Sequence, residues 1–136
     1  MITVCNHTHR TLIEVRYAET DQMGVVHHAV YPVWFEQARL DFFKSLGFDY
    51  VMIEKMGYKC PVLKLEVNYR APTHYGEFVQ VETTLRRKGN FHFEFSYKLF
   101  VDEKLCSTGS SVHCFLKNDA VTNELPPQIL TLFQNI

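Results

Sequence analysis

Residues 30–46 carry apolar side chains at the spacing of one helix face, and no other segment constrains the fold as strongly. The apolar positions recur three or four residues apart, at Val30, Tyr31, Trp34, Phe35, Ala38, Phe42 and Leu46. That period predicts one long helix, with Pro32 tolerated in its first turn and Gly47 ending it. A helix face this apolar must be covered by something large.

The segments after the helix alternate between apolar and polar residues, which is the pattern of strands. Strands are expected over 10–18 before the helix and over 61–69, 78–85, 91–100 and 105–116 after it. Hairpin turns are expected at Gly89-Asn90 and Asp102-Glu103, and short helices over 49–56 and 126–133. One long helix with an antiparallel sheet predicts an α+β fold in which the sheet curls around the helix. Because a single helix covers one sheet face only partly, we expect at least a dimer.

Composition and charge limit the classes of function. The chain has 136 residues, which suits a single domain over 1–136. Its 14 basic and 15 acidic side chains give a formal net charge of −1, which argues against a nucleic-acid binder and an electrostatic membrane anchor. No stretch approaches the ~20 apolar residues of a membrane span. The first residues lack the apolar core of a signal peptide, so we expect a cytoplasmic protein. The 4 cysteines form no CxxC pair, which predicts reduced thiols and no zinc site.

The segment over residues 17–31, YAETDQMGVVHHAVY, lies directly before the predicted long helix and gathers acids, histidines and a glycine. The first turn of a helix presents unpaired backbone N–H groups and a partial positive charge. Such an end can hold a carbonyl oxygen as it gains negative charge during acyl transfer. Asp21 could attack that carbonyl or activate a water, and Gly24 would let the backbone approach a ligand closely.

Each of these residues also has a plainer interpretation. An aspartate in a loop before a helix is most often a turn or capping residue. The pair His27-His28 with the nearby acids could form a metal site, although adjacent residues rarely bind the same ion. His27 alone is more often a packed or hydrogen-bonded side chain.

The motif E-T-D-x-x-G-V-V-x-H-x-x-Y resembles the signature of the 4-hydroxybenzoyl-CoA thioesterase family. It is formed here by Glu19, Thr20, Asp21, Gly24, Val25, Val26, His28 and Tyr31. The run W-F-E-x-A-R over residues 34–39 and the run VNYRAP over 67–72 resemble later parts of the family sequence. Within the family, the chain is most similar to small bacterial acyl-CoA thioesterases of the Tol-Pal-associated type. The resemblance implies the hotdog fold, an antiparallel sheet wrapped around one long helix.

The same resemblance implies roles for the loop residues. Asp21 would be the catalytic carboxylate, as nucleophile or general base, and the backbone N–H at or near His28 would polarise the thioester carbonyl. The His28 side chain matches the acyl-CoA thioesterase subgroup, whereas the 4-hydroxybenzoyl enzymes carry an aromatic residue there. His27 also departs from the subgroup, which usually has tyrosine, so we assign it no catalytic role.

Other residues are expected to support the site. The substrate would be bound by the loop residues Gly24 and Val25 and by Tyr31 and Trp34, which at helical spacing are first of all core residues. Glu36 is the rival acid, because some hotdog thioesterases use a helix carboxylate; the alternative is an acid paired with an arginine. For Glu19 we favour a structural hydrogen bond.

A basic run precedes the predicted Gly89-Asn90 turn and has two interpretations. The run Arg86-Arg87-Lys88 is either a solvated strand end or a site for the phosphates of coenzyme A, which the family binds near this connection. Arg70 and Lys64 are weaker options for the same role.

The activity implied by the resemblance is hydrolysis of an acyl-CoA thioester to a free acid and coenzyme A. A thioester carbonyl is already activated, so a carboxylate and an oxyanion site suffice, with no metal or redox cofactor. An acyl carrier protein thioesterase and a non-catalytic acyl-binding module stay open as alternatives. A hotdog hydratase would need His/Glu or Asp/His motifs that are not found. The family further suggests a homotetramer built as a dimer of dimers.

Overall fold

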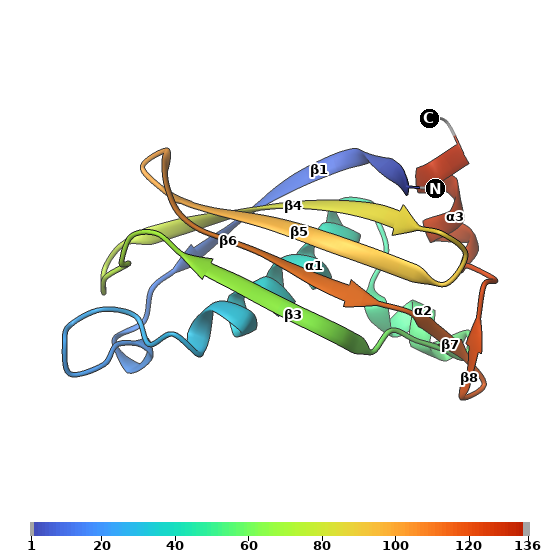
Figure 1. Cartoon of the computed structure of the whole chain (residues 1–136), viewed down its shortest axis with the longest axis horizontal. Helices are drawn as coiled ribbons and strands as arrows, with labels where there is room; N and C mark the ends of the chain where they lie inside the picture. Colours follow the sequence, from blue (N-terminus) through green and yellow to red (C-terminus); the bar gives the residue numbers. More distant parts are fainter. Residues whose placement is uncertain (1, 135–136) are drawn as a thin grey trace.

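Helix α1 (Val30–Ser45) lies against one face of a five-stranded antiparallel sheet in the computed structural model, which describes residues 2–134 (Figure 1). The strands of this sheet follow the order β1-β4-β5-β6-β3. Their bounds are Ile2–Glu14 (β1), Val62–Tyr69 (β3), Phe78–Lys88 (β4), His92–Val101 (β5) and Lys104–His113 (β6). The predicted α+β hotdog architecture is therefore confirmed. The long helix was expected over 30–46, and α1 ends one residue earlier, at Ser45.

The remaining elements are short. A second sheet has the order β2-β7-β8, with strands Tyr58–Lys59, Phe115–Lys117 and Ala120–Thr122. The short helices are η1 (Tyr17–Glu19), α2 (Tyr50–Lys55) and α3 (Pro127–Gln134). The two short helices α2 and α3 confirm the predictions over 49–56 and 126–133. No helix among residues 2–134 has the length and apolar character needed to cross a membrane.

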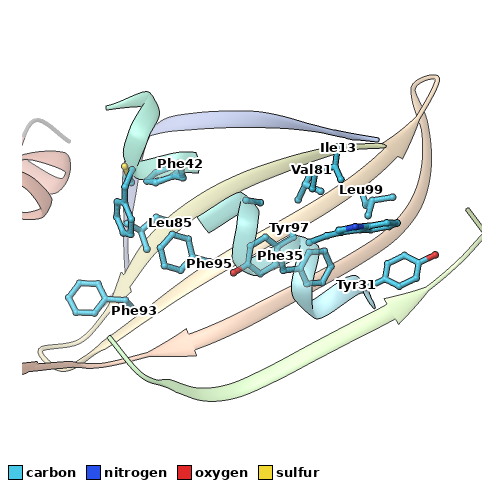
Figure 2. Packing of buried hydrophobic residues seen from close by; sticks show 14 of the residues in the cluster. Ile13, Tyr31, Phe35, Phe42, Val81, Leu85, Phe93, Phe95, Tyr97 and Leu99 are labelled. Atoms are coloured by element: carbon cyan, nitrogen blue, oxygen red, sulfur yellow. The ribbon is translucent and has the colours of Figure 1, made fainter. Parts of the chain in front are cut away.

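The core lies between α1 and the inward faces of β4 and β5. On the helix, Trp34, Phe35, Ala38 and Phe42 are buried, as the helical period predicted. On β5, alternate side chains from Phe93 to Leu99 are buried beneath them. The ring of Phe35 stacks on that of Tyr97, with centroids 4.3 Å apart and planes 3° from parallel (Figure 2). Stacked and edge-to-face aromatic pairs thus fix how the helix sits on the sheet.

Gly109 on β6 gives the helix room to approach the sheet. A Cβ at this position would lie 2.4 Å from an edge carbon of the Phe35 ring and 2.8 Å from the backbone oxygen of Glu66. Both contacts are shorter than van der Waals distances, so any side chain here must push α1 or β3 away. The absence of a side chain at Gly109 therefore sets the helix–sheet distance.

Several predicted boundaries were wrong. The first strand was expected over 10–18, but β1 spans Ile2–Glu14, and the chain then leaves the sheet to form η1. The residues before Arg10 are largely polar and do not alternate, so only their backbone pairing with β4 makes them a strand. The segment 105–116 was expected as one strand, but it breaks at Cys114, where the chain passes from the large sheet to the small one.

The predicted hairpin turns are present. Asp102 and Glu103 join β5 to β6 with φ angles of 47° and 64°, the consecutive positive values of a tight hairpin turn. Gly89, between β4 and β5, also has a positive φ of 68°. These turns place β4, β5 and β6 side by side, so that their alternating residues form one apolar face.

Strand β3 is one of the two edge strands of the sheet, and most of its apolar side chains are exposed to solvent. Exposed large apolar side chains are carried by Val62, Leu63, Leu65 and Tyr69. Because α1 lies over the middle of the sheet, it reaches only the Val67 end of this edge strand. An apolar edge strand of this kind is a surface that soluble proteins normally cover.

Candidate active site

The loop between η1 and α1 is a tight turn held by its own backbone. The amide of Asp21 donates to the carbonyl of Val25 at 2.8 Å, and the amide of Gly24 donates to the carbonyl of Asp21 at 3.0 Å. Gly24 has a φ of +79°, which residues with a Cβ rarely adopt. The Val26 amide donates to the Thr73 carbonyl at 2.9 Å, which ties the loop to the segment before β4. These bonds fix the backbone of the loop that carries Asp21.

A buried carboxylate anchors the loop to the helix. Glu19 is only 7% exposed, and its two oxygens accept from the indole N–H of Trp34 at 3.0 Å and the backbone amide of Arg16 at 2.8 Å. Its backbone carbonyl accepts from the His27 amide at 2.9 Å. Glu19 and Trp34 therefore hold the loop at a fixed distance from α1, which is the structural role expected for Glu19.

The Asp21 carboxylate opens onto a cavity of about 320 Å³. One oxygen, Oδ1, accepts from the Met23 amide at 2.8 Å, which orients the carboxylate while leaving it half-buried. The cavity lies between the loop and the end of β3, and its lining residues include Val25, His28, Tyr31, Tyr69 and Arg70. The Tyr69 hydroxyl donates to the His28 carbonyl at 2.6 Å, so β3 also supports the start of α1.

The residues directly before α1 leave a donor uncommitted beside the same cavity. The Ala29 amide donates to Nδ1 of His27 at 3.1 Å, and the Val30 amide donates to the His27 carbonyl at 3.0 Å. In the part of the chain that the structure describes, the amide of His28 has no such acceptor. Asp21 and His28 thus line one cavity just before the helix, and a carboxylate with a free N–H is the pair that acyl transfer to water requires.

The predicted substrate-binding residues fall into two groups. Val25 and Tyr31 line the Asp21 cavity, and Gly24 shapes the turn beside it. Trp34 is 1% exposed and lies outside that cavity, bonded to Glu19. Tyr69 was not predicted as a site residue, and Arg70 was expected only as a weaker option for binding the phosphates of coenzyme A. Both lie in the VNYRAP run, which was the available signal.

The basic run lies at the other end of the sheet. Lys88 pairs with Ile2, whereas Phe78, at the start of β4, pairs with Glu14 beside the loop. Figure 1 shows the turn after β4 at the opposite end from the loop before α1. Ten strand residues separate the two ends by about 33 Å. Within one chain, the structure therefore does not bring Arg86, Arg87 or Lys88 to the Asp21 cavity.

The basic side chains already have partners. Arg86 and Lys88 both pair with the buried carboxylate of Glu94. Although burial raises the pKa of Glu94, hydrogen bonds from Lys88 and Arg86 hold that pKa below its ordinary value. Arg87 donates to the carbonyls of Gly89 at 3.1 Å and Asn90 at 3.2 Å. A bound phosphate would have to compete with these contacts.

A second cavity, of about 370 Å³, lies under the middle of α1. Its walls are mainly apolar, and the residues that line it include Leu40, Phe43, Tyr50, Pro61, Val62 and Phe95. Four groups capable of chemistry join them, namely Glu36, which is the rival acid of the sequence analysis, Arg39, Cys60 and His113. Burial raises the pKa of the Cys60 thiol to about 12, so this thiol stays protonated and is not a nucleophile at neutral pH.

A chain of hydrogen-bonded polar side chains runs behind the second cavity, and its two ends, Arg39 and His113, line that cavity. The Arg39 Nη1 donates to the Tyr97 hydroxyl at 3.1 Å, and that hydroxyl lies 2.6 Å from the Ser111 Oγ. The Ser111 Oγ lies 2.8 Å from Nε2 of His113. The other ring nitrogen of His113, Nδ1, has no hydrogen-bond partner among the described residues. A half-satisfied polar network in an aromatic core costs stability, so it calls for a functional reason.

The burial of His113 gives a testable pH dependence of stability. Burial, helped by the nearby Arg39 charge, lowers the pKa of His113 to about 4. The unfolded residue has a pKa of about 6.5, so the unfolded chain binds more protons between these values and stability falls as the pH drops. We expect this residue to cost about 2 kcal/mol of unfolding free energy between about pH 7 and pH 5.

Urea denaturation at the two pH values measures this loss. The variant His113→Gln should show a much smaller loss, whereas His92→Gln, at an exposed position of β5, should keep the wild-type loss. An equal pH dependence in wild type and His113→Gln would contradict the assignment.

Comparison with known proteins identifies the family. The model of the thioesterase-like superfamily matches residues 15–133. The chain belongs to the thioesterase-like superfamily. This membership confirms the resemblance noted in the sequence, and the match extends beyond the loop motif to α3.

Several known proteins match most of the length of this chain. YneP of Bacillus subtilis, named as a candidate acyl-CoA thioesterase, is 44% identical over 94 residues, which are 69% of this chain and 68% of YneP. A DHNA-CoA thioesterase structure from Staphylococcus aureus is 40% identical with a TM-score of 0.78, covering 85% of this chain and 78% of that one. A hypothetical protein from Thermus thermophilus is 37% identical with a TM-score of 0.85, covering 90% and 95%.

Proposed function

We propose that this protein hydrolyses acyl-CoA thioesters to a free acid and coenzyme A. The observation that carries the proposal is that Asp21 and His28 line the same cavity, while the described residues offer the His28 amide no backbone acceptor. The name of YneP, which is 44% identical over 94 residues, supports the same activity.

In the proposed reaction, the thioester carbonyl oxygen accepts a hydrogen bond from the His28 N–H, where the helix N-terminus favours negative charge. Asp21 either takes a proton from an attacking water or attacks the carbonyl carbon itself and is regenerated by water. In both routes the carbon–sulfur bond breaks and one water is consumed for each acid released. The leaving thiolate takes the remaining proton. The His28 side chain is exposed at the same cavity.

The phosphates of coenzyme A need a basic partner near the cavity mouth. Arg70 is exposed and lines the Asp21 cavity, so we assign it to the first phosphate contact. The run Arg86-Arg87-Lys88 would reach the same ligand only from a partner subunit, since it lies at the far end of the sheet. That second assignment stays a prediction.

Thiol release from a panel of thioesters tests the proposed function. The panel contains short, medium, long and aromatic acyl-CoAs, and the same acyl groups on acyl carrier protein. Turnover of the CoA thioesters supports the proposal. Turnover of the carrier-protein thioesters alone would transfer the activity to that substrate. Binding of acyl-CoA without turnover would contradict hydrolysis and leave an acyl-binding module.

We further propose that the enzyme is a dimer joined through β3. Leu65, Val67 and Tyr69 face the α1 side of the sheet, because Val67 pairs with Gly109, whose missing side chain points at Phe35. Leu65 and Tyr69 are nevertheless exposed. The opposite edge strand, β1, is interrupted by a register shift between Val4 and Thr8, which blunts it as a pairing surface. The expected dimer of dimers and the cytoplasmic location stay predictions.

The sequence of β3 is compatible with two-fold pairing about Leu65. In an antiparallel pair centred there, Lys64 lies opposite the partner subunit's Glu66, and opposite charges in facing positions stabilise a sheet. The same pairing sets Tyr69 near Pro61 and Val62 of the partner subunit. In an antiparallel pair of β3 strands, the Val62 end of each strand lies beside the Tyr69 end of the other.

Replacement of Leu65 by aspartate tests this interface. Two carboxylates would face each other at the two-fold axis, so we expect a monomer by light scattering and at least a tenfold loss of thioesterase activity. Leu12→Asp places the same change on β1, where Leu12 is 61% exposed, and should leave the dimer intact. A monomeric wild type, or a dimeric Leu65→Asp, would exclude the β3 interface.

A further inference from the structure

The second cavity combines a cation with mainly apolar walls, which is an unusual environment for an arginine. The Arg39 side chain is 12% exposed, and its nearest carboxylate, that of Glu36, lies 3.8 Å away and is 67% exposed. Arg39 has five N–H donors, of which the Tyr97 hydroxyl takes one. The buried His113, whose Nδ1 has no hydrogen-bond partner among the described residues, also lines this cavity. The cavity therefore offers spare hydrogen-bond donors next to aromatic rings, and the one carboxylate on its lining, that of Glu36, is a largely solvent-exposed counterion.

The proposed two-fold axis joins this cavity to the Asp21 cavity of the other subunit. Tyr69 lines the Asp21 cavity, and Cys60, Pro61 and Val62 line the second cavity. Antiparallel pairing about Leu65 brings the Tyr69 end of one β3 to the Val62 end of its copy. Within one chain the two cavities are instead separated along α1, since Arg39 lies nine residues after Val30, or about 14 Å along the helix.

We infer that Arg39 is a specificity-determining residue, which binds an oxygen acceptor at the far end of the acyl group while the partner subunit's Asp21 acts on the thioester. This inference rests on the proposed thioesterase function and on the β3 dimer. The acyl group enters the second cavity, its apolar part lies among Phe43, Tyr50 and Phe95, and its terminal oxygen meets the Arg39 guanidinium. Two kinds of acyl group supply such an oxygen, namely a hydroxyaryl acyl group and a dicarboxylic acyl group.

The physical basis is the penalty for leaving most of the Arg39 N–H donors unpaired. Filling the cavity with a purely apolar acyl group excludes water from the guanidinium and adds no acceptor to the Tyr97 hydroxyl and the Glu36 carboxylate already beside it. A site built to hydrogen-bond a substrate oxygen therefore discriminates strongly against the analogue that lacks it. Hydrogen bonds to charged groups are also stronger than neutral ones, which enlarges the preference.

Two matched substrate pairs test the role of Arg39. The first pair is 4-hydroxybenzoyl-CoA and benzoyl-CoA, and the second is glutaryl-CoA and pentanoyl-CoA. We expect wild type to prefer the oxygen-bearing member of at least one pair, by about ten- to hundredfold in kcat/KM. Arg39→Met should abolish that preference by losing the oxygen-bearing substrate while keeping the apolar one. Arg39→Lys, which keeps the charge and loses the planar fork, should fall between the two.

The ratio of kcat/KM values within one variant is independent of how much enzyme is folded. A purely structural role for Arg39 would lower both members of a pair equally and would overturn the inference. Arg10→Met removes an exposed arginine on β1 that pairs with Glu82, outside both cavities, and should keep the wild-type ratios. Absence of turnover by wild type on every thioester would refute the proposed function itself. Turnover without any Arg39-dependent preference refutes only the role of Arg39.

Mixed dimers show from which subunit Arg39 acts. A dimer of one Asp21→Asn chain and one Arg39→Met chain contains one site with both native residues if the two come from different subunits. Co-expression at equal levels gives about half mixed dimers, so about one quarter of all sites should regain the native preference. If both residues acted within one chain, no mixed site would be intact, and the mixture would show only the sum of the two homodimers.

Discussion

Replacement of Asp21 by asparagine is expected to lower kcat for acyl-CoA hydrolysis by about 10²- to 10⁴-fold. Asparagine keeps the shape and the oxygen that accepts from the Met23 amide, so the turn should hold. It removes the negative charge and the basicity, so it neither attacks the carbonyl nor takes a proton from water. The measurement is thiol release on the best acyl-CoA of the panel, with circular dichroism to show that the fold is retained.

The matched control for this variant is Asp102→Asn. Asp102 lies in the β5–β6 turn with a φ of 47°, a conformation that asparagine adopts readily. It carries the same chemical change away from both cavities, so its kcat should equal that of wild type. Near-normal turnover by Asp21→Asn would show that another group performs the chemistry, with the Glu36 carboxylate as the first to examine.

Replacement of Gly109 by valine is expected to destabilise the fold by about 3 kcal/mol, because overpacking at this contact has no easy relief. The first added carbon alone would approach the Phe35 ring to 2.4 Å and the Glu66 backbone oxygen to 2.8 Å. Phe35 cannot turn away, since it is fully buried and stacked on Tyr97. Urea denaturation at a fixed protein concentration measures the loss, since dimerisation makes apparent stability concentration-dependent.

Ser110→Val supplies the comparison for the glycine variant. Ser110 is the next residue on β6 and points to the opposite face of the sheet, away from α1. Its replacement should change the unfolding free energy by no more than about 0.5 kcal/mol. Equal stability of the two variants would show that the close approach of α1 at Gly109 does not determine the packing.

Local patterns were sufficient to predict the helix and the central strands. The apolar period from Val30 to Phe42 predicted the buried face of α1, and the alternation along β4 and β5 predicted which of their residues meet it. These patterns succeed because each element buries one face against its neighbours in the same chain. β1 was mispredicted because its first residues gain their strand conformation from pairing with β4 rather than from alternation.

The loop motif predicted Asp21 and His28 together with their place before the helix, and the structure sets both on one cavity. It gave no sign of Tyr69 in the site, because that residue comes from β3, about 40 positions later along the chain, and reaches the loop only in the folded protein. The sequence also did not predict that Arg86-Arg87-Lys88 lies at the far end of the sheet from Asp21, since that position depends on strand order.

The second cavity was not predicted at all. Arg39 lies four residues after Phe35 and four before Phe43, so the helical period does place it on the apolar face, which was the available signal. The Tyr97 hydroxyl that accepts from Arg39 comes from β5, and His113, which lines the same cavity, comes from β6. In the sequence both residues look like ordinary strand residues. A buried network assembled from three elements becomes visible only in three dimensions.

The most direct test of the account is a crystal structure of the Asp21→Asn variant with an uncleaved acyl-CoA bound. The account predicts the thioester carbonyl oxygen about 2.7–3.1 Å from the His28 amide nitrogen. It predicts the carbonyl carbon about 3–3.5 Å from the side chain at position 21, with the acyl group directed toward the partner subunit's Arg39. A thioester bound elsewhere, with no contact to the His28 amide, would contradict the account.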